Sequence, residues 1–306
     1  MRLLLATASQ RQAWRDAFAR AMPGAELRVW PDAPPAVDYA IVWKPPPECF
    51  ERVRVERAIV NLGAGVDALL AVPTLPAGVP ILRLTDAGMA EQMAEYVTLA
   101  VLAAFREQRE YARQQNERLW RPRRRLDKSA FRVGLLGVGV LGAAVAQALR
   151  PFGFPLAGWS RGAREVPGVA AYAGPEGFHA MLAATSVLVC MLPLTPMTRG
   201  LLGAAALRRL PRGAHLVNVA RGELVVEADL LAALDDGHLA CATLDVFAEE
   251  PLPPGHPFWH HPRIVLTPHV SAATLIDESA AQVAARIAAH ARGERVGGVV
   301  DRERGY

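Results

Sequence analysis

Gly137, Gly139 and Gly142 have the GxGxxG spacing of a dinucleotide-binding turn. The apolar run Phe131–Leu136 before them predicts a buried strand, and Ala143–Leu149 after them has helical composition. In such a strand-to-helix turn the first glycine allows the tight bend, the second lets the backbone approach a pyrophosphate, and the third lets the helix pack on the strand. The N–H groups that open the helix then face the anion, so the spacing predicts a nucleotide site.

The residues after the next strand decide which dinucleotide fits. That strand is predicted at Phe154–Trp159 and continues into Ser160, Arg161 and Arg164, with no acidic residue before Glu165. A domain that prefers NAD usually carries Asp or Glu about 20 residues beyond the glycines, where the carboxylate binds the ribose 2′-OH. A carboxylate would repel a 2′-phosphate, whereas a guanidinium binds it through two parallel hydrogen bonds. The sequence therefore favours NADP(H) over NAD(H).

Polar residues also stand at the ends of later apolar runs. Arg221 follows HLVNV, Asp245 ends the segment ACATLD, and His269 follows the run Ile264–Leu266. Because ligands of open parallel sheets bind at the carboxyl ends of the strands, Arg221 is expected to point into a crevice and His269 to lie on a strand-end loop. The segment PLTPMTRG, after the strand predicted at Ser186–Leu192, forms a stiff loop with hydroxyls, placed where it could close over the cofactor.

A second glycine-containing turn, Gly63–Val66, follows the strand that opens Ala58–Leu70. Its backbone N–H groups would suit a small carboxylate at the carboxyl end of that strand. An ordinary tight turn explains this segment equally well.

The elements that position these residues alternate between strand and helix, which predicts parallel, doubly wound sheets in an α/β fold. The longest helical pattern, Met89–Ala112, is uninterrupted and is expected to leave the first domain and enter the second. The final helix, Asp277–Arg292, is expected to return and cover the first domain. The remaining elements are a helix at Arg11–Met22 and strands at Arg2–Ala6, Glu26–Trp30, Tyr39–Trp43, Ile81–Leu84, His215–Val219 and Ala240–Val246.

The composition fits a globular chain without a membrane segment. The chain has 306 residues, enough for two domains with separate cores, and 52% of them are hydrophobic. The most apolar run, Met181–Leu194, contains polar residues and a proline, falls short of the about 20 residues of a spanning helix, and fits a buried strand. The apolar run in the first residues, MRLLLATASQ, is shorter than the about 7 residues of a signal-peptide core, so a cytoplasmic location is expected.

Charge and cysteine content favour neither nucleic acid nor metal as a partner. The 34 Lys+Arg are almost balanced by 30 Asp+Glu. The basic run Arg118–Lys128 fits a solvated linker better than a nucleic-acid patch, because it lacks a binding motif. Cys49, Cys190 and Cys241 are odd in number and have no metal-ligand spacing, so three buried thiols in a reducing compartment are expected.

Taken together, these motifs resemble the D-isomer-specific 2-hydroxyacid dehydrogenase family. NLGAGVD, GVGVLG, LPLTPMTRG, NVARGELV, LDVFAEEPLP and LTPHVSAAT occur in the family's order and cover nearly the whole chain. Within the family the chain is most similar to the bacterial, NADPH-preferring glyoxylate/hydroxypyruvate reductases, on GMAEQMAEYV, QQNERLW, VWKPPP, WSR and VVDRERGY. The resemblance implies a Rossmann cofactor domain at 99–273, inserted into a flavodoxin-like substrate domain at 1–98 and 274–306.

The family's catalytic trio corresponds here to Arg221, Glu250 and His269. His269 would donate the proton to the carbonyl oxygen of a 2-keto acid, because imidazole titrates near physiological pH. Glu250 would hold the ring and favour its protonated form. The neighbouring Glu249 is the alternative partner of the ring. Arg221 would pair with the substrate carboxylate and polarise the carbonyl.

Other contacts follow from the same resemblance. The amides of Ala64 and Gly65 would hold the substrate carboxylate together with Arg221 and His269, and Trp43, Lys44 and Trp120 are further pocket candidates, although Trp120 could equally serve interdomain packing. Asp245 would contact the nicotinamide carboxamide. The remaining cofactor-binding residues would be Gly137, Gly139, Val140, Leu141, Gly142, Ser160, Arg161, Arg164, Leu192, Pro193, Thr198 and Val219.

The implied activity is the NADPH-dependent reduction of small 2-keto acids, glyoxylate to glycolate and hydroxypyruvate to D-glycerate. The implied assembly is a homodimer formed through Met89–Ala112 and its surroundings. A dehydrogenase for a bulkier 2-hydroxy acid and a dinucleotide-sensing, corepressor-like interaction protein are the alternatives. The presence of the whole catalytic trio argues against the sensor. The family's usual acid after the second strand is absent, which puts NAD use in doubt but not the reaction.

Overall fold

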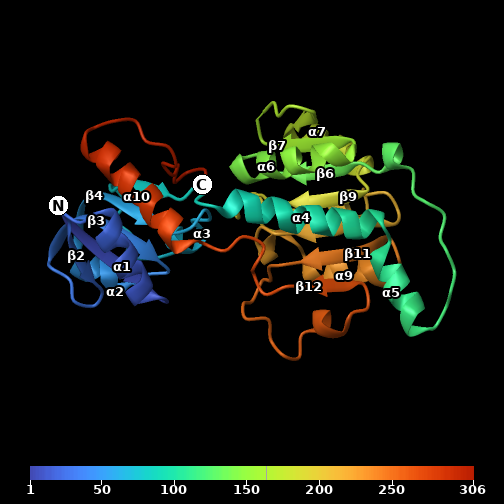
Figure 1. Cartoon of the computed structure of the whole chain (residues 1–306), viewed down its shortest axis with the longest axis horizontal. Helices are drawn as coiled ribbons and strands as arrows, with labels where there is room; N and C mark the ends of the chain where they lie inside the picture. Colours follow the sequence, from blue (N-terminus) through green and yellow to red (C-terminus); the bar gives the residue numbers. More distant parts are fainter. Residues whose placement is uncertain (163) are drawn as a thin grey trace. The chain divides into compact units, whose positions relative to one another are not determined.

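The computed structural model describes residues 1–162 and 164–306 and divides the chain into two compact units (Figure 1). Unit 1 comprises Met1–Met89 and Thr274–Tyr306, and unit 2 comprises Ala90–Ala273. In sequence, the second unit is therefore an insertion into the first. Each unit is built on a parallel sheet of its own, as the alternation of strands and helices predicts.

Unit 1 has a five-stranded sheet in the order β2-β1-β3-β4-β5, with every neighbouring pair parallel. This is the strand order of flavodoxin-like folds, so the predicted fold of this unit is confirmed. The strands are β1 (Arg2–Thr7), β2 (Glu26–Val29), β3 (Ala36–Trp43), β4 (Arg54–Asn61) and β5 (Ile81–Arg83).

Helices cover both faces of this sheet. On one face α1 and α10 pack against each other, and the α10 residue His290 brings Nδ1 to 3.1 Å from the hydroxyl of Tyr39. On the other face α2 and α3 bury Phe50 and Leu69 against the strands. The last helix of the chain therefore covers unit 1, as predicted. The helices are α1 (Arg11–Ala21), α2 (Glu48–Arg52), α3 (Asp67–Leu70) and α10 (Ile276–Ala291).

Unit 2 has a seven-stranded parallel sheet in the order β12-β11-β10-β9-β6-β7-β8. Counted from β6, this is the Rossmann order with one strand more, so the predicted cofactor-domain fold is confirmed. The strand order reverses between β6 and β9, where such sheets bind ligands. The strands are β6 (Val133–Leu136), β7 (Leu156–Ser160), β8 (Val169–Ala173), β9 (Val187–Cys190), β10 (Ala214–Asn218), β11 (Leu239–Leu244) and β12 (Ile264–Leu266).

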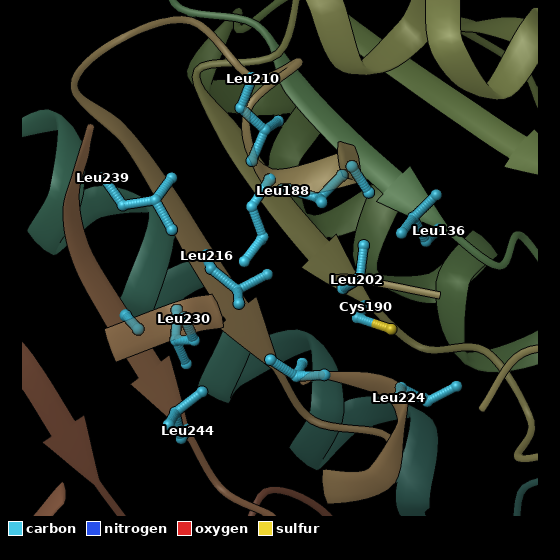
Figure 2. Packing of buried hydrophobic residues seen from close by; sticks show 14 of the residues in the cluster. Leu136, Leu188, Cys190, Leu202, Leu210, Leu216, Leu224, Leu230, Leu239 and Leu244 are labelled. Carbon is cyan, nitrogen blue, oxygen red and sulfur yellow. The ribbon is translucent and has the colours of Figure 1, made fainter. Parts of the chain in front are cut away.

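The core of unit 2 lies in two layers, one on each face of the sheet. Along β9, Val187 and Val189 pack with α4 and α6, whereas Leu188 and Cys190 pack with α7, α8 and α9. Figure 2 shows the second layer, where Leu188, Cys190 and leucines of β6, β10 and β11 meet. The helices are α4 (Met89–Phe105), α5 (Gln108–Asn116), α6 (Val140–Leu149), α7 (Gly174–Ala183), α8 (Ala204–Leu207) and α9 (Glu227–Asp235), with 3₁₀ turns at Lys128–Ala130, Arg150–Phe152, Gly222–Leu224 and Pro257–His260.

Two predicted elements are wrong. The helix predicted without interruption over Met89–Ala112 is broken at Glu107, which adopts a left-handed conformation (φ 52°) and receives a 2.7 Å hydrogen bond from Arg123 Nε. The strand predicted over Met181–Leu194 begins only at Val187, because Met181 still belongs to α7. Helices α7 and α9 lie where no helix is predicted. The pattern of apolar residues also does not reveal β8, which has no buried residue.

The three cysteines are free and buried, as predicted. Burial raises the pKa of the Cys49 and Cys241 thiols to about 11 and that of Cys190 to about 12. At neutral pH they therefore remain thiols and are poor nucleophiles. Across the two described stretches, no helix combines the length and apolarity needed to span a membrane.

His215 on β10 should make folding sensitive to mild acid. Burial lowers the pKa of its ring to about 4, against about 6.5 in the unfolded chain. Above pH 6.5 both states are neutral and His215 has no effect, whereas below pH 6.5 the unfolded chain takes up the proton first. Linkage then lowers the free energy of unfolding by about 2 kcal/mol at pH 5. Urea unfolding at pH 7.5 and pH 5 should show this loss in the wild type and less of it in His215→Leu. An equal loss in both proteins would contradict the assignment.

Candidate active site

The glycine turn between β6 and α6 is shaped to admit a ligand. Gly137 adopts φ +98°, and a Cβ there would lie 2.9 Å from the carbonyl oxygen of Met191. A Cβ on Gly142 would lie 2.1 Å from the carbonyl oxygen of Gly137, so only glycine lets α6 begin this close to β6. A Cβ on Gly139 would meet no other described residue within 4 Å. The open backbone at Gly139 and the N-terminus of α6 beside it suit a pyrophosphate.

Other predicted cofactor residues surround this turn along the edge of the same sheet. Val140 is the first residue of α6 and is 49% exposed, and Leu141 follows it. Beyond β9, the Thr198 hydroxyl donates to the carbonyl of Pro193 at 2.7 Å and accepts from the amide of Thr195 at 2.8 Å, which stiffens the loop. Leu192 and Val219 are buried, at the start of this loop and beyond β10 respectively.

The basic residues after β7 lie on the surface of unit 2. Ser160 ends β7, and its hydroxyl donates to the carbonyl of Gly162 at 2.7 Å. Arg161 and Arg164 are exposed. A turn that carries two cations and no carboxylate suits a phosphate better than a ribose hydroxyl.

Arg221 stands just beyond β10, on a loop that Asn218 shapes. The buried Asn218 side chain donates from Nδ2 to the carbonyl of Arg221 at 2.9 Å and accepts from the amide of Ala220 at 3.2 Å. The Arg221 guanidinium donates to the carbonyl of Ala220 at 2.7 Å. Arg221 therefore lies at the carboxyl edge of the sheet.

His269 and Glu250 form a close pair at the same edge. The Nδ1 atom of His269 lies 2.8 Å from Oε2 of Glu250, and the other carboxylate oxygen of Glu250 accepts from the amide of Phe247 at 3.0 Å. Of the two adjacent glutamates, Glu250 is thus the one that contacts the ring. An ionised carboxylate can only accept, so Nδ1 carries a proton and Nε2 is the atom left for a substrate. The His269 side chain is 45% exposed, so a ligand can reach it.

Asp245 holds the loop that carries His269. It is completely buried, and its carboxylate accepts from the Thr267 hydroxyl at 2.6 Å and from the amides of Val270 and Ser271 at 2.8 Å each. The amide of His269 donates to the Asp245 carbonyl at 2.8 Å, and His269 itself adopts a left-handed conformation (φ 56°). These bonds hold a backbone conformation that non-glycine residues rarely adopt.

Unit 1 contains the turn predicted to bind a carboxylate. Ala64 and Gly65 are partly exposed. Trp43 packs directly on this turn, since a Cβ on Gly63 would lie 2.3 Å from its ring. Lys44, with φ 45°, is exposed and places its Nζ 6.0 Å from the centre of the Trp43 ring. Among the residues that the structure describes, no group of three or more His, Cys, Asp or Glu is arranged to hold a metal ion.

Comparison with known proteins identifies the family. Residues 98–271, more than half of the chain, match the family described as D-isomer specific 2-hydroxyacid dehydrogenase, NAD binding domain. The chain belongs to this family. It is 46% identical over 301 residues to the glyoxylate/hydroxypyruvate reductase A of Yersinia enterocolitica, with 96% of each chain covered. The resemblance inferred from the motifs is confirmed.

Solved structures of the family share the whole architecture. A D-isomer specific 2-hydroxyacid dehydrogenase from Xanthobacter autotrophicus, in complex with NADPH and MES, has a TM-score of 0.94 at 43% identity, with 99% of both chains covered. The NADPH-dependent glyoxylate/hydroxypyruvate reductase of Sinorhizobium meliloti, in complex with NADP and sulfate, has a TM-score of 0.93 at 35% identity, covering 100% of this chain and 99% of that one.

Some residues that shape the dehydrogenase site are not evident from the sequence. Tyr96 on α4 places its hydroxyl 2.5 Å from that of Thr267, which in turn donates to Asp245. Asn218 supports the Arg221 loop, and Gly222 lets that loop meet the segment after β11. One signal is available for Asn218, since it is a polar residue between Val217 and Val219 at the end of an apolar run.

Proposed function

We propose that this protein reduces glyoxylate to glycolate and hydroxypyruvate to D-glycerate with NADPH. The observation that carries the proposal is the His269–Glu250 pair, 2.8 Å apart, at the same sheet edge as Arg221 and the open glycine turn. The name of the relative from Yersinia enterocolitica, at 46% identity, supports the same reaction.

The residues divide the chemistry between them. When bound, the nicotinamide cofactor supplies the hydride. His269 holds its transferable proton on Nε2, oriented by the bond from Nδ1 to Glu250, and gives it to the carbonyl oxygen of the substrate. Arg221 pairs with the substrate carboxylate and stabilises the developing negative charge on the carbonyl oxygen. The amides of Ala64 and Gly65 hold the carboxylate as well.

The cofactor preference rests on the residues after β7. Ser160, Arg161 and Arg164 offer a hydroxyl and two guanidinium groups where NAD-dependent relatives carry a carboxylate. The 2′-phosphate of NADP would bind there, and NAD, lacking it, would bind less tightly. The relatives from Xanthobacter autotrophicus and Sinorhizobium meliloti, solved with NADPH and NADP, support this preference.

The test is the oxidation of NADPH and of NADH, followed at 340 nm with glyoxylate, hydroxypyruvate, pyruvate and a branched 2-keto acid in parallel. Fast turnover of glyoxylate and hydroxypyruvate with NADPH is the expected result.

Replacing both Arg161 and Arg164 by Ser should raise the KM for NADPH about 10- to 100-fold and leave the KM for NADH within twofold, since two charge-assisted bonds are lost. Turnover of the branched acid alone would indicate a bulkier substrate. Tight NADPH binding without any turnover would indicate a sensor.

We also propose that the enzyme is a cytoplasmic homodimer. Its free cysteines support the reducing compartment. The dimer is supported by large apolar side chains of unit 2 that are exposed on α4, α5 and the segment that follows. There Leu99 is 68% exposed and Trp120 97% exposed, with Tyr111 and Leu126 also exposed. Exposed large apolar side chains are typical of a protein interface, and the predicted partner is a second copy.

Leu99→Glu should separate the subunits, because it places a charge at one of these exposed apolar positions. Light scattering at micromolar concentration should give a dimer mass for the wild type and a monomer mass for the variant. Val299→Glu is the matched control, since Val299 is a similarly exposed residue (56%) of unit 1, and should remain dimeric. A monomeric wild type would contradict the proposal.

A further inference from the structure

The turn after β4 is held by two side chains that donate to its carbonyl groups. Asn61, 2% exposed, donates from Nδ2 to the carbonyl of Gly63 at 3.0 Å and to that of Gly65 at 2.8 Å. The carbonyl between them, that of Ala64, accepts from Nη1 of Arg83 at 3.1 Å. Three consecutive carbonyls are therefore fixed by two donors.

Fixing the carbonyls also fixes the amides. In a trans peptide the C=O and N–H groups point in opposite directions. The cis peptides of the described chain lie elsewhere, at Trp30–Pro31 and Glu250–Pro251. Because the Gly63 and Ala64 carbonyls turn toward Asn61 and Arg83, the amides of Ala64 and Gly65 turn to the other side. Neither amide has a hydrogen-bond acceptor within residues 1–162 and 164–306. The turn therefore presents two adjacent free donors, as a bound carboxylate requires.

Arg83 is itself anchored and keeps its charge unpaired. Its amide donates to the carbonyl of Gly298 at 2.9 Å, and Arg286 on α10 donates both to the carbonyl of Arg83 and, at 2.7 Å, to the hydroxyl of Thr85. Burial lowers the pKa of both guanidinium groups, and the two cations repel each other. In the described part of the chain neither arginine forms an ion pair with a carboxylate. An anion in front of the turn would relieve this repulsion.

We propose that Asn61 and Arg83 are positioning residues that turn the amides of Ala64 and Gly65 toward the substrate carboxylate, and that the charge of Arg83 strengthens that anion site from behind. The inference rests on the proposed function, because the carboxylate is that of the 2-keto acid. It assigns the discrimination of 2-keto acids from aldehydes and ketones that lack a carboxylate to two residues of unit 1, the buried Asn61 and the half-buried Arg83.

The first experiment separates KM from kcat. Arg83→Met should raise the KM for glyoxylate about 10-fold or more, the equivalent of one charge-assisted bond, with kcat within threefold and the Kd for NADPH unchanged. Arg83→Lys should restore part of the KM, because it keeps the charge. Arg302→Met is the matched control: Arg302 also lies in unit 1 and donates to two carbonyls, at 2.6 and 2.7 Å, but away from the turn, so its KM should stay at the wild-type value. An unchanged KM in Arg83→Met would overturn the proposal.

A second measurement does not depend on turnover. In ¹⁵N-labelled protein the amide resonances of Ala64 and Gly65 should shift when oxamate, a carboxylate analogue of the substrate, is added. The shifts should be lost or need about 10-fold more oxamate in Asn61→Ser and Arg83→Met.

If the wild type shows these shifts but reduces no 2-keto acid, the proposed function fails and the anion site stands. If the Ala64 and Gly65 resonances of the variants shift at the same oxamate concentration as in the wild type, the positioning role is wrong. Should Arg83→Met fail to fold, Asn61→Ser and Arg83→Lys test the same claim.

Discussion

His269→Gln should lower kcat for glyoxylate reduction by about 10²- to 10⁴-fold, the usual contribution of a general acid. Glutamine is similar in length and its amide can still donate to Glu250, so the loop should keep its conformation. An amide, however, has no proton to give at neutral pH. The Kd for NADPH, followed by cofactor fluorescence, should therefore remain within about threefold of the wild type while turnover falls.

The matched control is His260→Gln, because His260 is an exposed histidine of the same unit, in the 3₁₀ turn Pro257–His260. This variant should keep the wild-type kcat. A His269→Gln enzyme with full kcat would show that the proton comes from another group. A variant that lost NADPH binding together with activity would indicate that His269 supports the fold of the loop rather than the chemistry.

The sequence predicts those parts of the site where the backbone geometry admits a single residue type or where a residue's place after a strand decides its position. Gly137 adopts a positive φ, and a Cβ on Gly142 would clash with the carbonyl oxygen of Gly137. Because only glycine fits at both positions, the spacing of the glycines alone predicts the turn. Arg221 and His269 each come three positions after the end of a strand, and the carboxyl ends of parallel strands always meet at one edge of a sheet. For these residues, the order of elements along the chain is sufficient.

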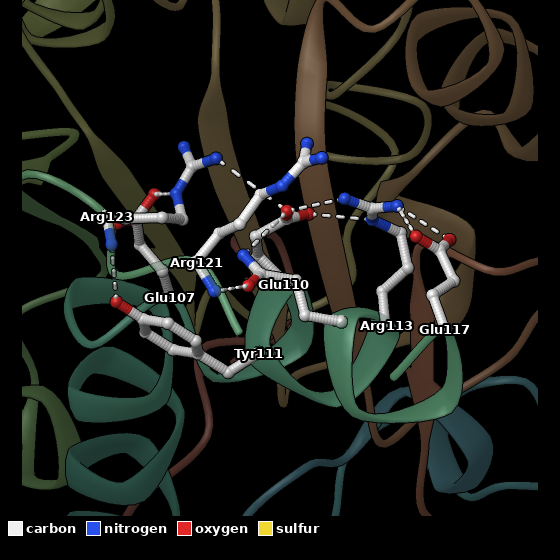
Figure 3. A network of polar contacts seen from close by, with 8 residues as sticks. Glu107, Glu110, Tyr111, Arg113, Glu117, Arg121 and Arg123 are labelled. Atoms are coloured by element: carbon white, nitrogen blue, oxygen red, sulfur yellow. Dashed lines mark hydrogen bonds and ion pairs between the residues drawn. The ribbon is translucent and has the colours of Figure 1, made fainter. Parts of the chain in front are cut away.

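Residues that act through hydrogen bonds to backbone carbonyls or to other side chains cannot be found in this way. Asn61 and Asn218 are each one polar residue at the end of an apolar strand, and nothing in the sequence says which carbonyls they reach. The Tyr96 hydroxyl meets Thr267 across 171 positions of sequence, so this contact depends on how α4 packs on the sheet. The break in the helix at Glu107 has the same origin, since its partner Arg123 comes from the following segment, within the network of Figure 3.

The hydrogen bonds that lead from Tyr96 through Thr267 and Asp245 to the His269 loop have a definite donor and acceptor at each step. Thr267 has one hydroxyl proton and gives it to Asp245, an acceptor when ionised, so the Tyr96 hydroxyl must be the donor to Thr267. Asp245 then accepts from the amides on the far side of His269. The orientation of the His269 ring is thus tied to α4 through a buried carboxylate as well as to Glu250. Burial of Tyr96 raises the pKa of its phenol, which keeps the hydroxyl protonated and able to donate.

Gly222→Ala should lower kcat strongly although the residue bears no functional group. A Cβ at Gly222 would lie 1.9 Å from the carbonyl carbon of Phe247 and 2.2 Å from the amide nitrogen of Ala248. Both are backbone atoms, so no side-chain rotation relieves the clash and one of the two loops must move. The first loop carries Arg221 and the second leads to Glu250, and a displacement of about 1 Å between catalytic groups can cost about 100-fold in rate.

We therefore expect kcat to fall at least about 100-fold and the free energy of unfolding to fall by about 1–3 kcal/mol, the usual cost of overpacking. Gly255→Ala is the control in the same unit, because a Cβ there would meet no other described residue within 4 Å, and both quantities should stay at their wild-type values. NADPH binding should be retained, since the glycine turn at Gly137 lies outside the clash, and its retention would show that the loss of activity is a local displacement of the two loops. If Gly222→Ala kept the wild-type kcat, the close contact of the two loops would not be what aligns Arg221 with His269 and Glu250.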